Sequence, residues 1–170
     1  MKTINKIISV VGLLVFSSVG GAEPQSINSA TDLNGLNQLQ LDELFTSNTA
    51  GPIPDGEGRG TAIFFPGTLL TGPIQTVLSI AWQGKIFDAD RGTLVNRLFG
   101  VRVVAADVYY GTSWFDGEEA IIVDYAGTVP FAKGGRDELR EIAPGIYLGR
   151  GYRPSLFGSV FASNFVLEFR

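Results

Sequence analysis

The chain has 170 residues, a length that suits one domain, and it contains neither cysteine nor histidine. These two absences exclude a Ser-His-Asp triad, a thiol nucleophile and haem ligation by His or Cys. They also exclude zinc and copper sites built from nitrogen and sulfur ligands. Carboxylates could still bind a hard cation, but Asp88-Ala89-Asp90 lacks the further oxygens of a calcium loop and suits a solvated turn. We expect neither a metal site nor a cofactor.

The first 22 residues have the pattern of a cleavable secretion signal. Lys2 and Lys6 precede an apolar run over residues 7–16, and small residues follow as far as Ala22. The run is too short to cross a hydrocarbon core of about 30 Å as a helix, so cleavage is preferred over an uncleaved anchor. We expect a periplasmic or secreted protein with no transmembrane anchor after signal cleavage.

The rest of the chain is acidic. Two of the 13 basic residues lie in the signal segment, which leaves 11 basic against 17 acidic side chains and a formal net charge of −6. An acidic domain repels the phosphate backbone, so we expect no nucleic-acid partner.

Residues 23–55 predict a helical appendage followed by a Gly/Pro-rich linker, and residues 56–170 the main domain. Thr31 and Asp32 resemble a helix N-cap, and the leucines that follow favour a short helix over residues 39–45. Residues 47–60 have the composition of a loop, with no apolar periodicity.

From residue 61 onward, short apolar or aromatic runs alternate with turn residues. Residues 73–82 have one apolar face at helical spacing and predict a second helix. Asp116-Gly117 predicts a hairpin turn. The remaining runs predict strands over residues 61–65, 85–87, 101–110, 120–125, 146–152 and 159–169.

About six to eight short strands at this spacing are typical of a barrel or a sandwich. The 22 glycines suit tight turns and are hard to reconcile with a helical bundle. We predict a mainly β fold, an antiparallel lipocalin-like β-barrel with one or two short helices, and a β-sandwich as the alternative.

Three segments carry a family resemblance. Residues 82–87, 113–125 and 136–149 match W-x-G-K-x-F, S-W-x-D-G-x-x-x-I-x-x-D-Y and R-D-E-[IL]-R-E-x-x-P-G-[IL]-Y-L-G. On these motifs the chain resembles a family of uncharacterised bacterial proteins, over about residues 55–169. The resemblance is compatible with a lipocalin-like fold and implies no activity.

The densest run of charge is residues 136–141. On a strand its side chains would form two charged faces, one of them made by Arg136, Glu138 and Arg140. Such a face inside a barrel would have to pair its charges, and it could then anchor the head group of an amphiphile or form an acid–base site. The alternative is a solvated turn of helix.

Other candidates flank the predicted strands. Asp124 closes an apolar strand, either at the rim or pointing into a cavity. Trp82 and Trp114 suit barrel-end plugs or ligand stacking, and Lys85 could form a Schiff base only if it is desolvated. The predicted ligand-binding set is Trp82, Lys85, Tyr109, Trp114, Asp124, Arg136, Glu138, Arg140 and Tyr147.

These features favour a carrier or sensor for a hydrophobic or amphiphilic small molecule. The alternative is an isomerase, cyclase or lyase acting on a hydrophobic substrate, with Asp124, Glu138 and Tyr147 as acid–base groups and Arg136 or Arg140 holding an anion. A structural or outer-membrane protein is a third class, but the other strands lack the long lipid-facing alternation that it requires.

Overall fold

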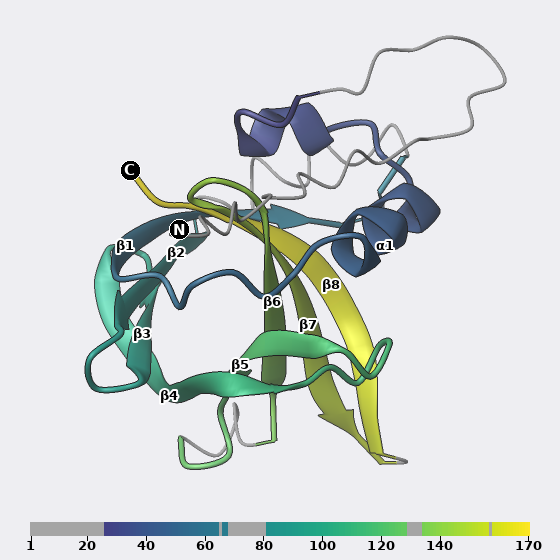
Figure 1. Ribbon diagram of the computed structural model, residues 1–170. Coiled ribbons are helices and arrows are strands. Elements are labelled where there is room, and N and C mark those ends of the chain that lie inside the picture. The colour runs from purple at the N-terminus through teal and green to yellow at the C-terminus, as the bar shows by residue number, and fades with distance from the viewer. Residues whose placement is uncertain (1–25, 65, 68–80, 129–133, 157) are drawn as a thin grey trace, which may run out of the picture.

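The computed structural model describes residues 26–64, 66–67, 81–128, 134–156 and 158–170 (Figure 1). Eight antiparallel strands follow one another around a closed barrel, and the last pairs back with the first. The predicted antiparallel lipocalin-like barrel is confirmed, and the sandwich alternative is wrong. The strands are β1 (Gly56–Ile63), β2 (Trp82–Asp88), β3 (Thr93–Leu98), β4 (Val101–Thr112), β5 (Glu119–Asp124), β6 (Arg136–Ala143), β7 (Ile146–Ser155) and β8 (Gly158–Glu168).

The apolar side chains form two buried layers. On β5, successive side chains point to opposite faces of the barrel wall. Ile121 and Val123 belong to the interior layer, whereas Ile122 belongs to the layer outside the barrel. The outer layer is covered by α1 (Gln38–Thr46), through Leu41 and Phe45, and by the 3-10 helix η1 (Ala30–Leu33). Strands buried on both faces read as continuous apolar runs, which is the pattern of β5.

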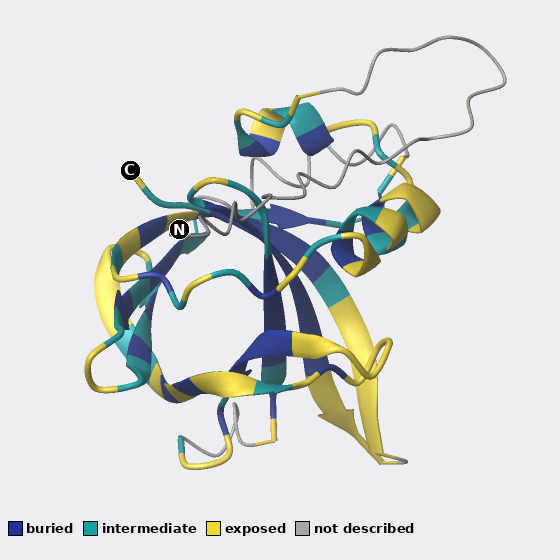
Figure 2. Cartoon of the chain, viewed as in Figure 1, coloured by how far each residue is buried: buried dark blue, intermediate teal, exposed yellow. Residues whose placement is uncertain are grey.

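The helix predicted over residues 39–45 is confirmed as α1, which lies against the outside of the barrel (Figures 1 and 2). Asn37 caps it: its side chain accepts from the Gln40 amide at 3.0 Å, and the Gln40 side chain accepts from the Asn37 amide at 2.9 Å. This reciprocal capping satisfies two donors that the first turn would otherwise leave unpaired.

The loop predicted over residues 47–60 is wrong in its second half, because β1 begins at Gly56. The inward positions of β1 include Gly58 and Gly60, which carry no side chain because aromatic rings fill that space. A Cβ at Gly58 would overlap the Phe169 ring, and one at Gly60 would lie 2.7 Å from the Trp82 ring. Glycine on a barrel strand therefore marks the close approach of a ring and not a turn.

Two further strands differ from the sequence prediction. β3 was not predicted, because its inward position Asn96 is polar and interrupts the apolar alternation. Residues 136–141 lie on β6, so the solvated helical turn is wrong. The strand is stable with charge on both faces because partners on other elements neutralise each side.

One end of the barrel is closed by the segment between α1 and β1, which crosses it in Figure 1. Ala50 is buried in the interior layer. Tyr147 donates its hydroxyl to the Pro52 carbonyl at 2.8 Å, and the Tyr110 hydroxyl accepts from the Ile53 amide at 3.0 Å. These contacts close this end of the barrel.

The predicted signal segment, residues 1–22, lies outside the described residues. So does the predicted helix over residues 73–82, apart from Ala81 and from Trp82, which begins β2. Among the described residues, no helix is long and apolar enough to span a membrane.

Candidate functional site

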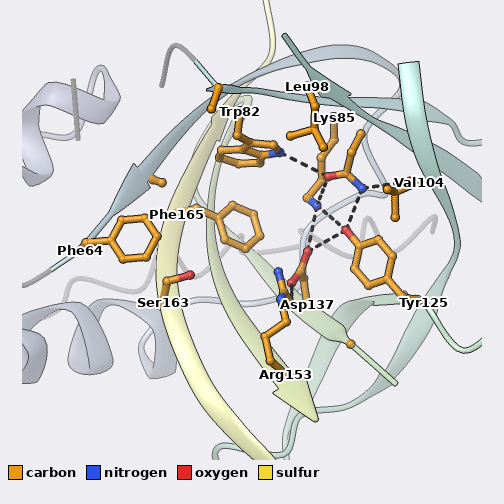
Figure 3. A pocket seen from close by; sticks show the side chains of 14 residues that line it. Phe64, Trp82, Lys85, Leu98, Val104, Tyr125, Asp137, Arg153, Ser163 and Phe165 are labelled. Carbon is orange, nitrogen blue, oxygen red and sulfur yellow. Dashed lines mark hydrogen bonds and ion pairs between the residues drawn. The ribbon is translucent and has the colours of Figure 1, made fainter. Parts of the chain in front are cut away.

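A cavity of about 330 Å³ occupies the end of the barrel opposite the closing segment (Figure 3). Most of its wall is apolar, and a small group of polar side chains lies at its inner side. The residues that line it are Ala62, Phe64, Ala81, Trp82, Lys85, Asn96, Leu98, Val104, Tyr125, Gly135, Asp137, Arg153, Ser163 and Phe165.

Lys85 is the centre of the polar group. The alternation of β2 turns it inward, where it is almost completely buried. Its ammonium donates to the Asp137 carboxylate at 2.8 Å, the Tyr125 hydroxyl at 2.5 Å and the Asn96 side-chain oxygen at 2.9 Å. These three bonds use all three N–H groups of the lysine, which satisfies the charge inside the protein. We call Lys85, Asn96, Tyr125 and Asp137 the Lys85 cluster.

The other members of the Lys85 cluster also bond to one another. The Tyr125 hydroxyl accepts from the Asn96 amide at 3.1 Å and donates to Asp137 at 3.0 Å. The Asn96 amide also donates to the Val104 carbonyl at 3.0 Å. Val104 has a φ of 55° and lies where the β3–β4 register shifts, so a β-bulge presents this carbonyl.

Aromatic rings surround the ammonium of Lys85. The rings of Trp82, Tyr125 and Phe165 have their centroids 5.5, 5.3 and 5.3 Å from the lysine nitrogen. The Trp82 indole also donates to Asn96 at 3.3 Å. Cation–π attraction to these faces adds to the ion pair with Asp137.

Arg153 lies at the edge of the cavity and is the second cation beside Asp137. It donates to the other Asp137 oxygen at 3.0 Å and to the Tyr152 carbonyl at 2.7 Å, both from the same terminal nitrogen. Its side chain is 48% exposed, whereas that of Asp137 is 1% exposed. Asp137 thus receives bonds from Lys85, Tyr125 and Arg153.

The electrostatics of the cluster fix its protonation. Burial alone would lower the pKa of Lys85, but the charges and hydrogen bonds of Asp137 and Tyr125 together outweigh it, and the pKa is raised. Burial likewise opposes ionisation of Asp137, yet Lys85 and Arg153 hold its pKa below the usual value. Burial and the Asp137 charge raise the pKa of the Tyr125 phenol. At neutral pH Lys85 is therefore an ammonium, Asp137 a carboxylate and Tyr125 a neutral phenol. A protonated lysine is not a nucleophile, so this state does not favour the Schiff-base role.

The predicted residues of β6 point away from the cavity. One strand face carries Arg136, Glu138 and Arg140, as the strand interpretation predicts, but this face lies outside the barrel. Asp137 and Leu139 are on the other face and point inward. The Glu138 carboxylate accepts a hydrogen bond from the Arg136 guanidinium at 2.9 Å.

On the same outer face, Glu138 accepts from the Ser113 hydroxyl at 2.6 Å and from the Trp114 amide at 2.7 Å. Arg140 pairs with both oxygens of Asp116, at 2.7 and 2.9 Å. These bonds hold the β4–β5 turn against the outside of β6. The hairpin turn predicted at Asp116-Gly117 is confirmed there.

The remaining predicted residues are spread over the molecule. Tyr109 and Asp124 bond to each other at 3.1 Å on the outside of β4 and β5. Trp114 is 53% exposed and packs under the Arg136 guanidinium. Tyr147 lies inside the barrel at the closed end. Of the nine predicted ligand-binding residues, Trp82 and Lys85 line the cavity.

Sequence reasoning missed the partners of Lys85. Each of the three motif segments contributes one member of the cluster: Lys85 in the first, Tyr125 in the second and Asp137 in the third. A lysine at an inward position of an apolar strand requires a buried acid, which was the signal available. Within the described ranges, no three acidic side chains come close enough together to hold a metal ion.

No family model and no curated protein matches the chain, and the family resemblance of the three motifs stays a prediction. Among solved structures, a protein from Thermomonospora curvata is similar in fold. It has a TM-score of 0.52 and 19% sequence identity, and the match covers 79% of this chain and 88% of the other. At this identity the likeness shows the barrel fold alone.

Proposed function

We propose that this is an exported protein that binds a hydrophobic or amphiphilic small molecule inside its barrel. The observation that carries the proposal is the cavity of about 330 Å³, which has apolar walls around a polar group already bonded within the protein. Ligand pockets are typically about 300–1,000 Å³, mostly apolar, with a few fixed polar groups. The cavity therefore suits a small ligand at the lower end of that range.

The geometry favours binding over acid–base chemistry. The three acid–base candidates from the sequence lie far apart. Asp124 is on the outer surface, Glu138 is under the β4–β5 turn, and Tyr147 is at the closed end. Inside the cavity, the pKa of Tyr125 is raised and that of Asp137 is lowered, so neither group is poised for proton transfer near neutral pH.

Export is supported by the composition of residues 1–22. The test is expression of the full chain in a bacterium with a periplasm, followed by mass measurement of the protein released from that compartment. Export with cleavage predicts a mature chain that begins at Glu23. Recovery of the uncut chain in the cytoplasm would contradict it.

Binding is tested with the neutral dye N-phenyl-1-naphthylamine, which fluoresces in apolar surroundings. The delipidated wild-type protein is expected to bind the dye saturably at one site. Leu98→Trp enlarges a side chain of the cavity wall and should weaken binding at least about tenfold, since a tenfold change corresponds to only about 1.4 kcal/mol.

The matched control is Leu39→Trp, which makes the same replacement at a helix position that is 78% exposed. It should leave dye binding unchanged. A wild-type protein that is folded but binds no dye would contradict the proposal, as would equal effects of the two substitutions.

A further inference from the structure

The described lining of the cavity carries a net positive charge, in a chain whose formal net charge is −4. Among the described residues, its charged lining groups are Lys85, Asp137 and Arg153, two cations and one anion. Lys85 neutralises Asp137 at 2.8 Å, which leaves the charge of Arg153 in excess. Apolar walls hold few counter-charges, so this excess acts on whatever enters the cavity.

The two cations differ in what they can still bind. Every N–H of Lys85 is bonded within the cluster. Arg153 makes both of its protein bonds from one terminal nitrogen, and its Nε and other terminal nitrogen have no partner among the described residues. A guanidinium presents five donors in a fork that matches the oxygens of an anion. Of the described lining residues, Arg153 is therefore the one that can pair with a charged group of a ligand.

The apolar part of the cavity adjoins this cation. Figure 3 shows Arg153 and Asp137 next to each other, with Ser163, Phe165 and Trp82 on the neighbouring wall. Because Asp137 already receives bonds from Lys85 and Tyr125, it does not present an uncompensated negative charge to an incoming anion.

We infer that the cavity selects amphiphiles with a singly charged anionic head group, a carboxylate or a sulfonate, which pairs with Arg153 while the apolar body packs on Trp82 and Phe165. This inference rests on the proposed function and names the chemical class of its ligand. Lys85 acts in it only by neutralising Asp137.

The test compares two dyes that share an apolar skeleton. N-phenyl-1-naphthylamine is neutral, and 8-anilinonaphthalene-1-sulfonate adds one sulfonate. Arg153→Gln is expected to weaken binding of the sulfonate dye about tenfold, which is the size of one charge-assisted hydrogen bond. Binding of the neutral dye should weaken less than about twofold. Arg91→Gln, at a side chain 82% exposed and away from the cavity, should change neither.

Two further measurements keep the test independent of folding defects in one variant. Arg153→Lys retains the charge and should recover part of the lost sulfonate affinity. In the wild-type protein, added salt should weaken the sulfonate dye and leave the neutral dye unchanged, because screening acts on the charge pair alone.

The outcomes separate the two proposals. If the folded wild-type protein binds neither dye, the proposed function fails. If the neutral dye binds but Arg153→Gln weakens both dyes equally or neither, the cavity binds small molecules without selecting anions and this inference is overturned.

Discussion

At the scale of single residues, the molecule depends on a buried lysine whose charge is satisfied on every side. Lys85 bonds to Asp137, Tyr125 and Asn96, and three aromatic rings surround it. Such a group is stable only with all of its partners, because removal of one leaves an uncompensated charge inside the protein. The same bonds place the polar side chains at fixed positions in the cavity.

Lys85→Met tests this dependence. It leaves the Asp137 carboxylate buried without its main partner, so the free energy of unfolding should fall by about 3 kcal/mol, measured by urea denaturation. The double variant Lys85→Met with Asp137→Asn removes both charges and should be less destabilised than the sum of the two single changes. Additive effects would show that the pair does not interact.

The pH dependence of stability follows from Asp137. Its pKa is lower in the folded protein than in the unfolded chain, so the folded state binds fewer protons. Its contribution to stability is therefore complete above the unfolded pKa of about 3.9 and is lost as the pH falls through the folded pKa. Asp137→Asn should make the loss of stability below about pH 4 shallower than in the wild type. Equal acid slopes for the two proteins would contradict this.

The sequence singles out Trp82 as one of only two tryptophans, and Lys85 as one of only two lysines outside the signal segment. It does not identify Asp137, because the charge run on β6 has acids on both faces and sequence alone cannot tell which face turns inward. Arg153 and Asn96 carry no local signal at all. Their role depends on β3, β6 and β7 meeting around one end of the barrel.

At the scale of elements, strand glycines and inward-pointing rings are matched in position. On β7, Gly149 pairs with Phe165 of β8, whose ring lies where a Cβ of Gly149 would be. Gly58 and Gly60 of β1 are related in the same way to rings of Phe169 and Trp82. These glycines let large rings fold across the interior, which is why glycine-rich segments form strands here.

Gly149→Ala tests the match between glycine and ring. The added methyl group overlaps the Phe165 ring, so the free energy of unfolding should fall by about 1–3 kcal/mol from overpacking. Gly127→Ala is the control, because no atom lies within 4 Å of a Cβ at that turn position. Its effect should be within about 0.5 kcal/mol of zero in the same urea titration. Similar losses for both variants would contradict the account.

On the outer face of the barrel, β6 and β7 carry charged side chains beneath α1, where a sheet covered by a helix usually has apolar residues. Partners on other elements make these charges stable. Arg150 pairs with Asp42 of α1, and its guanidinium lies 3.7 Å from the centre of the Phe115 ring. Arg140 donates to the carbonyl of Phe45 at 3.1 Å. The helix periodicity predicts α1 well, but these tertiary partners decide that the charged run beneath it is a strand.

At the scale of the whole molecule, the two ends of the barrel differ. The segment that follows α1 closes one end. There the Phe169 ring packs against the rings of Phe87 and Tyr147, and its centroid lies 5.6 Å from each of theirs. The other end holds the cavity and its cationic edge. The packed end supplies stability, which allows the cavity end to keep polar groups and, between the described residues, unfilled space.

The placement of the two tryptophans allows the central claim to be measured directly. Trp82 lines the cavity and Trp114 lies on the outer surface. We would titrate the Trp114→Phe and Trp82→Phe variants with a bromine-carrying long-chain alcohol, which quenches tryptophan fluorescence on contact. Binding inside the barrel predicts saturable quenching in Trp114→Phe, where Trp82 remains, and little in Trp82→Phe. Quenching confined to Trp82→Phe, or absent from both folded variants, would contradict a ligand site in the barrel.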